Sequence, residues 1–294
     1  IKDQIRCGAA YRLGLTGKGI GVAVLDTGIF LHRDFDSRVT GFADMVNGKN
    51  FAYDDCGHGT HICGIIGGSG RMSGGRYSGI APGCDLVMVK VLDRKGNGYS
   101  SDVLAGISWI LERKEKLGIR ILNISVGACS KRGMSENSAL VKGVNRAWDA
   151  GLVVVVAAGN NGPRTMSITT PGISRKVITV GCSDDDREVL VGGNRMVDYS
   201  GRGPTAACIC KPDLVAPGCS VVSCSSRADK YTIKSGTSMS TPIVSGAVAL
   251  LLERFPDMTN KDVKLRLRES SVDIGLPRNQ QGWGLLDVGK MIGK

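Results

Sequence analysis

The stretch Ile20-Gly-Val-Ala-Val-Leu25, followed directly by Asp26, indicates the fold class of this 294-residue chain. It is a continuous apolar run of strand length, rich in β-branched side chains. A run that is apolar on both faces is typical of a parallel strand that helices cover on either side of its sheet. Four further runs of this kind follow along the chain, at residues 86–92, 119–124, 152–157 and 177–181.

Helical patterns lie between and after these runs. Residues 101–117 place Val103, Ile107 and Ile110 on one stripe. The alternation of strands and helices predicts an α/β fold, with three αβα layers around a mostly parallel sheet. No linker divides the chain, so we expect a single domain over residues 1–294. Further helices are expected at residues 136–150, 240–255 and 260–270.

The composition suits a large core, because 42% of the residues are hydrophobic and only 22% are charged. The net charge is +11, but the basic residues are scattered and do not cluster with aromatic side chains, so we expect no nucleic-acid partner. No segment reaches the ~18 apolar residues of a membrane span. We expect a monomer. The first residues carry neither an initiator Met nor a signal-peptide pattern, which favours a processed or trimmed form.

Ten cysteines are spread over the chain, at positions 7, 56, 63, 84, 129, 182, 208, 210, 219 and 224. An even number suggests disulfides in a secreted chain, but that rule is strong only for short chains with little core. Cys208-Ile-Cys210 is too close for a zinc-type pair. We therefore predict reduced thiols and a cytoplasmic protein, with secretion as the alternative.

Polar side chains follow three of the predicted strands. In open parallel sheets, ligands collect at the carboxyl ends of the strands, where Asp26, Ser125 and Asn160 stand. A carboxylate at the end of a buried strand is costly unless something pairs with it. Asp26 in Asp-Thr-Gly is also compatible with an ordinary turn, and Asn160 in Asn-Asn-Gly with another.

His58 opens an apolar helical pattern, with His61 three residues later. The two imidazoles invite a zinc interpretation, but no HExxH glutamate accompanies them. One histidine acting as a base, hydrogen-bonded to one carboxylate, is the simpler interpretation. Ser238 stands near the start of a helix that contains Pro242, where free N–H groups favour a developing negative charge. For an isolated serine, an ordinary helix cap is the alternative.

Together these groups follow the order Asp, His, Ser, which is the order in subtilisin. The chain resembles the subtilase family over nearly its whole length, and the residues at 41–47 and 54–58 resemble the intracellular AprX-type subtilases of Gram-positive bacteria. The motifs that carry the resemblance are Asp26-Thr-Gly28-Ile, His58-Gly-Thr-His61, Ala157-Ala-Gly-Asn160 and Gly236-Thr-Ser238-Met-Ser-Thr-Pro242.

The resemblance implies a subtilisin-like fold and a serine endopeptidase. Ser238 would attack the peptide carbonyl, His58 would accept its proton, and Asp26 would hold the imidazole. The Asn160 side chain and the Ser238 N–H would stabilise the oxyanion. Water then hydrolyses the acyl-enzyme, and this chemistry requires no cofactor.

The family binds peptide or protein substrates as an extended strand between two segments, here Gly98-Tyr99-Ser100 and Ser125-Val126-Gly127. Residues 125–128 and Ala157-Ala158-Gly159 would wall the first side-chain pocket. Val126-Gly-Ala128 departs from the family's common Leu-Gly-Gly. We expect a hydrophobic or modest-sized residue before the scissile bond.

The family's tight calcium site is doubtful in this chain. Asp34 matches one ligand position, but the loop at residues 67–77 lacks the Asn-rich pattern and carries two arginines, which repel a cation. We therefore expect no metal at this position and leave a weaker structural calcium open elsewhere. A separate hypothesis places the thiol of Cys56 or Cys63 against His58, which would make the enzyme sensitive to mercurials.

Two rival functions use the same residues. A catalytically silent subtilase fold used for binding requires a broken triad, whereas all four catalytic positions are intact. An esterase or transacylase needs no extended peptide-binding edge, and residues 98–100 are predicted to supply one.

Overall fold

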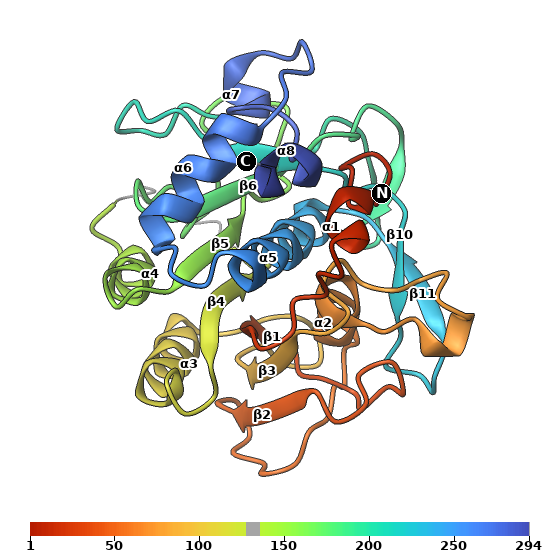
Figure 1. Cartoon of the computed structure of the whole chain (residues 1–294). Helices are drawn as coiled ribbons and strands as arrows, with labels where there is room; N and C mark the ends of the chain where they lie inside the picture. The colour runs from red at the N-terminus through yellow and green to blue at the C-terminus, as the bar shows by residue number, and fades with distance from the viewer. Residues whose placement is uncertain (128–135, 294) are drawn as a thin grey trace.

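The computed structural model describes residues 1–127 and 136–293, and its centre is a seven-stranded sheet (Figure 1). Every pairing in this sheet is parallel. The strand order is β2 (Val39–Asp44), β3 (Asp85–Lys90), β1 (Gly21–Asp26), β4 (Ile119–Ile124), β5 (Val153–Ala157), β6 (Ile178–Cys182) and β9 (Leu214–Ala216).

All five apolar runs of the sequence are strands, and the α/β fold with a mostly parallel sheet is confirmed. The runs are buried almost throughout, as parallel strands between helices must be. β2 and β9 were not indicated by the sequence. β2 lies at the sheet edge and is mostly half-buried, and β9 has only three residues, so neither presents a long apolar run.

Helices cover both faces of the sheet. Met88 and Val89 are consecutive in β3 and point to opposite faces. Met88 packs against Gly59 of α2 (His58–Gly67), whereas Val89 packs against Gly106 of α3 (Ser100–Arg113). α5 (Thr237–Arg254) lies beside α2, and α4 (Ala139–Asp149) lies beside α3. This arrangement gives the three layers that the sequence predicts.

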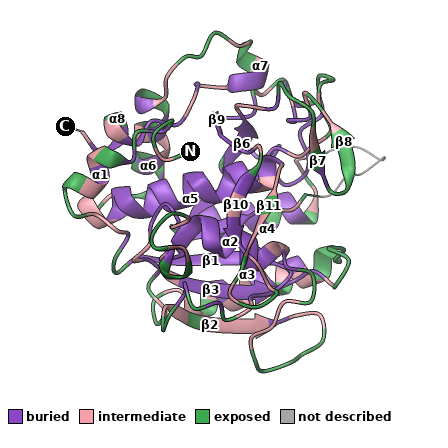
Figure 2. Ribbon diagram, turned by 90° about the vertical axis from the view of Figure 1, so that its right-hand side faces the viewer, coloured by how far each residue is buried: buried purple, intermediate pink, exposed green. Residues whose placement is uncertain are grey.

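The helix α5 runs through the middle of the molecule and is buried over almost its whole length (Figure 2). The structure corrects its predicted start from 240 to Thr237, because the backbone of Gly236 has a φ of 138° and cannot belong to the helix. Pro242 therefore lies in the second turn of α5.

The remaining helix boundaries agree with the sequence to within a few residues. α3 ends at Arg113 and not at 117, and α4 begins at Ala139 because Ser138 caps it through a hydrogen bond from Val141 N to Ser138 Oγ. α6 (Asn260–Ser270) has the expected bounds. None of the helices in the described part of the chain is long and apolar enough to cross a membrane.

Short elements complete the described structure. Two antiparallel hairpins flank the main sheet, and the hairpin of β10 and β11 packs near α2. The bounds are α1 (Gly8–Arg12), η1 (Arg71–Ser73), β7 (Val189–Val191), β8 (Asn194–Met196), β10 (Val221–Cys224), β11 (Tyr231–Lys234), α7 (Arg278–Gln281) and α8 (Val288–Ile292).

Candidate active site

The carboxylate of Asp26 lies at the end of the inner strand β1 and is fully buried. The N–H of Thr27 donates to Asp26 Oδ1 over 2.7 Å. His58 Nδ1 lies 2.8 Å from Oδ1 and 2.9 Å from Oδ2 of the same carboxylate. The buried acid is therefore paired with an imidazole, as the cost of burying it alone requires.

The pKa of His58 reflects this pairing. Burial on its own lowers the pKa, but the charge of Asp26 and the hydrogen bond with it raise the pKa above the ordinary value of 6.5. The side chain of His58 is still 23% exposed, so the ring reaches the surface while its Nδ1 edge is held inside. Nδ1 donates to the carboxylate in this arrangement, which leaves Nε2 as the nitrogen that can accept a proton.

A second acid, Asp54, builds the loop that carries His58. Its Oδ1 accepts hydrogen bonds from Thr27 Oγ1 at 2.9 Å and from Gly57 N at 2.7 Å. Its Oδ2 accepts from the N–H and the hydroxyl of Thr60, at 2.9 and 2.6 Å. Asp54 thus connects Thr27, which follows Asp26, to the first turn of α2, which begins with His58. Its role was not predicted from the sequence, although an Asp just before a helix start is a common capping signal.

Glycine is required where this loop meets the strand end. Gly28 has a φ of 121°, and a Cβ at this position would collide with the carbonyl oxygen of Tyr53. Gly59 in the first turn of α2 faces the carbonyl of Gly28 just as closely. These two contacts let the helix approach β1 closely enough for His58 to reach Asp26.

Ser238 is the second residue of α5 and is half-buried. Its Oγ donates to the carbonyl oxygen of Ser125 over 2.7 Å. Ser125 directly follows β4, in which Ile124 pairs with Leu25, so Ser125 and Asp26 are adjacent at the carboxyl edge of the sheet. The hydroxyl therefore lies at the same edge as the acid.

No hydrogen bond between Ser238 and His58 is present among the described residues. The serine hydroxyl donates to the carbonyl of Ser125 instead.

Asn160 follows β5, and its amide is oriented by the start of α5. The Oδ1 atom accepts hydrogen bonds from the N–H and the hydroxyl of Thr237, each at 3.0 Å. Thr237 Oγ1 also accepts from Gly159 N at 3.2 Å. With the oxygen held in this way, the donor end of the amide is turned away from Thr237. Thr237 is a second positioning residue, and its role was not predicted from the sequence.

The predicted substrate segments flank one pocket of about 220 Å³. Gly98, Tyr99 and Ser100 are exposed on one side, and Val126 and Gly127 line the other. The pocket wall between them is largely apolar and comes from Leu92, Val103, Ile124, Val126 and Leu140.

The expected walls of the first side-chain pocket converge on Thr169. A Cβ at Gly127 or at Gly159 would collide with the Thr169 side chain, and Thr169 N donates to Ala158 O. Ala157 and Ala158 are buried behind Gly159. Ala128, the position that departs from the family pattern, lies outside the described residues.

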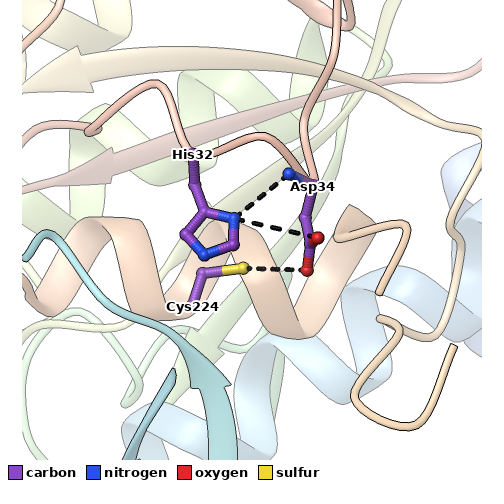
Figure 3. A group of neighbouring side chains, drawn as sticks. All are labelled: His32, Asp34 and Cys224. Atoms are coloured by element: carbon purple, nitrogen blue, oxygen red, sulfur yellow. Dashed lines mark hydrogen bonds and ion pairs between the residues drawn. The ribbon is translucent and has the colours of Figure 1, made fainter. Parts of the chain in front are cut away.

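The residues around Asp34 do not fit a calcium ion. Asp34 Oδ1 accepts from Met72 N at 2.9 Å, and Oδ2 accepts from the Tyr231 hydroxyl at 2.7 Å. Figure 3 shows that His32 and Cys224 also face this carboxylate. The Arg38 guanidinium donates to the carbonyls of Gly67 and Asp34. Its positive charge therefore lies beside the oxygens that a calcium ion would need.

The zinc interpretation of His58 and His61 does not fit either. His61 is buried, and its Nε2 lies 3.1 Å from the carbonyl of Val221, whereas His58 Nδ1 faces Asp26. Burial lowers the pKa of His61 to about 3. The two imidazoles therefore contact different groups and do not form a shared zinc site.

The two cysteines near His58 have different environments. Cys56 is exposed, whereas Cys63 is buried in α2, where burial raises the pKa of its thiol well above 9. A buried protonated thiol is a poor nucleophile, so of this pair only Cys56 offers a thiol that a mercurial can reach readily. The mercurial hypothesis stays a prediction for Cys56.

A buried acid, an imidazole and a hydroxyl at the carboxyl edge of a parallel sheet are the parts of a serine hydrolase site. Residues 17–284 match the model of the subtilase family. The chain is 43% identical over 287 residues to the serine protease AprX of Bacillus subtilis (strain 168), with 92% of this chain and 64% of that protein covered. It is 34% identical to subtilisin Savinase of Lederbergia lenta, with 97% and 95% covered.

Among solved structures, sphericase superposes with a TM-score of 0.80 at 32% identity and covers 93% of each chain. The chain therefore belongs to the subtilase family and is a serine protease of the subtilisin type. It spans a little less than two thirds of the length of AprX.

Replacement of Asp54 by alanine is expected to lower kcat/KM by about 10²-fold, because a shift of the catalytic loop by about 1 Å costs that much. The effect should appear with a peptide substrate and equally in the rate of fluorophosphonate labelling. The matched control is Asp257→Ala, at an exposed aspartate remote from this loop, which should leave both rates unchanged. Equal rates for the Asp54 variant and the unmodified protein would show that the loop does not depend on this carboxylate.

Proposed function

We propose that the chain hydrolyses internal peptide bonds through an acyl-enzyme on Ser238. His58 accepts the serine proton at Nε2, and Asp26 holds the ring and stabilises its charged form. The observation that carries the proposal is the pairing of His58 with the buried Asp26 carboxylate at the sheet edge where Ser238 also lies.

The resting contact between Ser238 and Ser125 fits this proposal. The hydroxyl leaves the Ser125 carbonyl and turns to His58 when it reacts, and hydrogen bonds of an empty active site commonly tighten only when substrate is bound. The carbonyl of Ser125 is then free to accept a hydrogen bond from the main chain of an extended peptide.

Catalysis requires a donor for the oxyanion. Asn160 supplies its Nδ2 group and α5 supplies the N–H of Ser238, close to the positive end of the helix dipole. Thr237 supports this role because it occupies the Asn160 oxygen and so determines which end of the amide faces the substrate.

Fluorophosphonate treatment followed by peptide mapping tests the nucleophile. Label is expected on Ser238 alone, and Ser238→Ala should abolish both labelling and casein cleavage. The variant Ser240→Ala serves as a control, because Ser240 Oγ is buried and donates to Ala216 O. Label on another residue, or casein cleavage that survives in Ser238→Ala, would refute the proposal.

Asn160→Ala is expected to lower kcat by about 10²–10³ with little change in KM, the cost known for subtilisin itself. Thr237→Val keeps the Asn160 donor and one of its two supports, so its loss should be smaller. Steady-state kinetics on one peptide substrate compares the two variants. A change confined to KM in Asn160→Ala would contradict an oxyanion role.

The pH dependence of kcat/KM reports the protonation of His58, which must be neutral to act as a base. Because Asp26 raises the pKa of His58, activity should rise with pH to a midpoint above 6.5. Asp26→Asn removes the charge, so the midpoint should move to lower pH while kcat falls by roughly 10⁴-fold. A midpoint below 6.5 in the unmodified protein would argue against the pairing.

The apolar pocket between the two substrate segments supports a preference for peptides with a large apolar side chain at the matching position. Leu140→Trp should fill the pocket and shift the preference toward small residues, with kcat/KM for small-residue peptides retained. A library of peptides varied at one position at a time measures the shift. An unchanged profile would place substrate side chains elsewhere.

We also propose that the chain works in the cytoplasm. The support is that the nine cysteines within residues 1–127 and 136–293 are all free thiols, as a reducing compartment maintains them. Recovery of the protein in the culture medium of its source cells, and not in the lysate, would contradict this location.

A further inference from the structure

Two cysteines and an aspartate meet beyond the carboxyl ends of the neighbouring strands β6 and β9. Cys182 is the last residue of β6 and pairs with Ala216 of the neighbouring strand β9. Cys219 stands three residues beyond that partner, and Asp184 two residues beyond Cys182. The ligand atoms of the three side chains all lie within 4.8 Å of one another.

The contacts within this cluster are short. Cys182 Sγ lies 3.1 Å from Asp184 Oδ1, and the Tyr199 hydroxyl lies 3.2 Å from Cys182 Sγ and 3.1 Å from Cys219 Sγ. A tetrahedral zinc ion with bonds of about 2.0–2.3 Å keeps its ligand atoms roughly 3.3–3.8 Å apart. The cluster therefore needs only a small expansion to enclose an ion.

Access and preorganisation distinguish this cluster from the one at Asp34. Cys182 is fully buried, but Cys219 and Asp184 are only half-buried, which leaves a route for an ion. Asp184 is held in place because its Oδ1 accepts from Gly218 N at 2.7 Å and from Cys219 N at 3.1 Å. At the other cluster, His32, Asp34 and Cys224 are all buried, and the His32 Nδ1 lone pair is taken by Asp34 N.

We propose that Cys182, Cys219 and Asp184 form a binding site for a borderline divalent cation such as Zn²⁺, with a water molecule as the fourth ligand. A ligand set of thiolate sulfurs and one carboxylate oxygen binds zinc and cadmium in preference to calcium and magnesium. Binding releases the two thiol protons to solvent and involves no change of oxidation state. The Tyr199 hydroxyl lies within reach of both sulfurs and can donate to one of the two thiolates, as the outer-shell partners of metal ligands do.

The site is coupled to the segment that carries Ser238. A Cβ on Gly218 would lie 2.8 Å from Cys182 Sγ and would collide with Ser240 of α5. Gly218 O accepts from Gly236 N at 3.0 Å, and Gly236 directly precedes α5. An ion bound by Cys219 and Asp184 therefore acts on the loop that anchors the start of this helix.

Cadmium titration tests the site, because thiolate-to-cadmium charge transfer gives an ultraviolet absorption that does not depend on activity. The background is the full chain with Ser238→Ala and with Cys56, Cys129, Cys208 and Cys210 replaced by serine, so that self-digestion and these four thiols do not contribute. One equivalent of Cd²⁺ should saturate the absorption band, and added Zn²⁺ should displace the cadmium and remove the band. Cys219→Ser should reduce the band by about half and weaken binding at least about 10-fold.

Two further variants make the test decisive. Asp184→Asn removes a ligand that does not absorb, so the band should remain while the affinity falls at least about 10-fold. Cys224→Ser is the matched control at the Asp34 cluster and should leave the titration unchanged, and far-ultraviolet circular dichroism checks that each variant is folded. The proposal would be overturned if folded Cys182→Ser and Cys219→Ser each gave the same titration as the background protein that retains both cysteines. So would a band lost only in Cys224→Ser, or a Cys182–Cys219 disulfide found by mass spectrometry in place of any band.

Discussion

The hydrogen-bonded pair of His58 and the buried Asp26 is the interaction on which the rest of the site depends. A carboxylate at the end of β1 is fully excluded from solvent, and the imidazole and the N–H of Thr27 compensate for its desolvation. The pair requires α2 to begin very close to β1, which Gly28 and Gly59 permit and Asp54 secures. The close approach of α2 to β1 is therefore required both by the packing of the fold and by the chemistry of the site.

The parallel sheet brings together residues from four distant parts of the chain. Asp26 ends β1, Ser125 and Asn160 follow the adjacent strands β4 and β5, and Ser238 lies on α5, which packs against the same strands. The common direction of the strands is sufficient to place their final residues at one edge. A few direct contacts, such as those of Thr237 with Asn160 and Gly159, then orient the side chains.

Much of this could be predicted from the sequence, and the exceptions have physical causes. The five buried strands carry long β-branched runs, whereas β2 and β9 are short or half-buried and leave no comparable signal. The residues at the strand ends were found because polar groups after apolar runs stand out. The contact of Ser238 with Ser125 depends on a single rotamer, and the organising role of Asp54 depends on tertiary proximity to Thr27, so neither could be read from spacing.

The burial of α5 on every side has a consequence for when the chain becomes active. A helix without a solvent-facing stripe gains no stability until both its neighbouring helix and the sheet beneath it are in place. The nucleophilic serine is carried at the first turn of that helix, so a half-assembled polypeptide holds its serine in no defined position relative to the imidazole. Catalytic activity therefore depends on the same packing that forms the core.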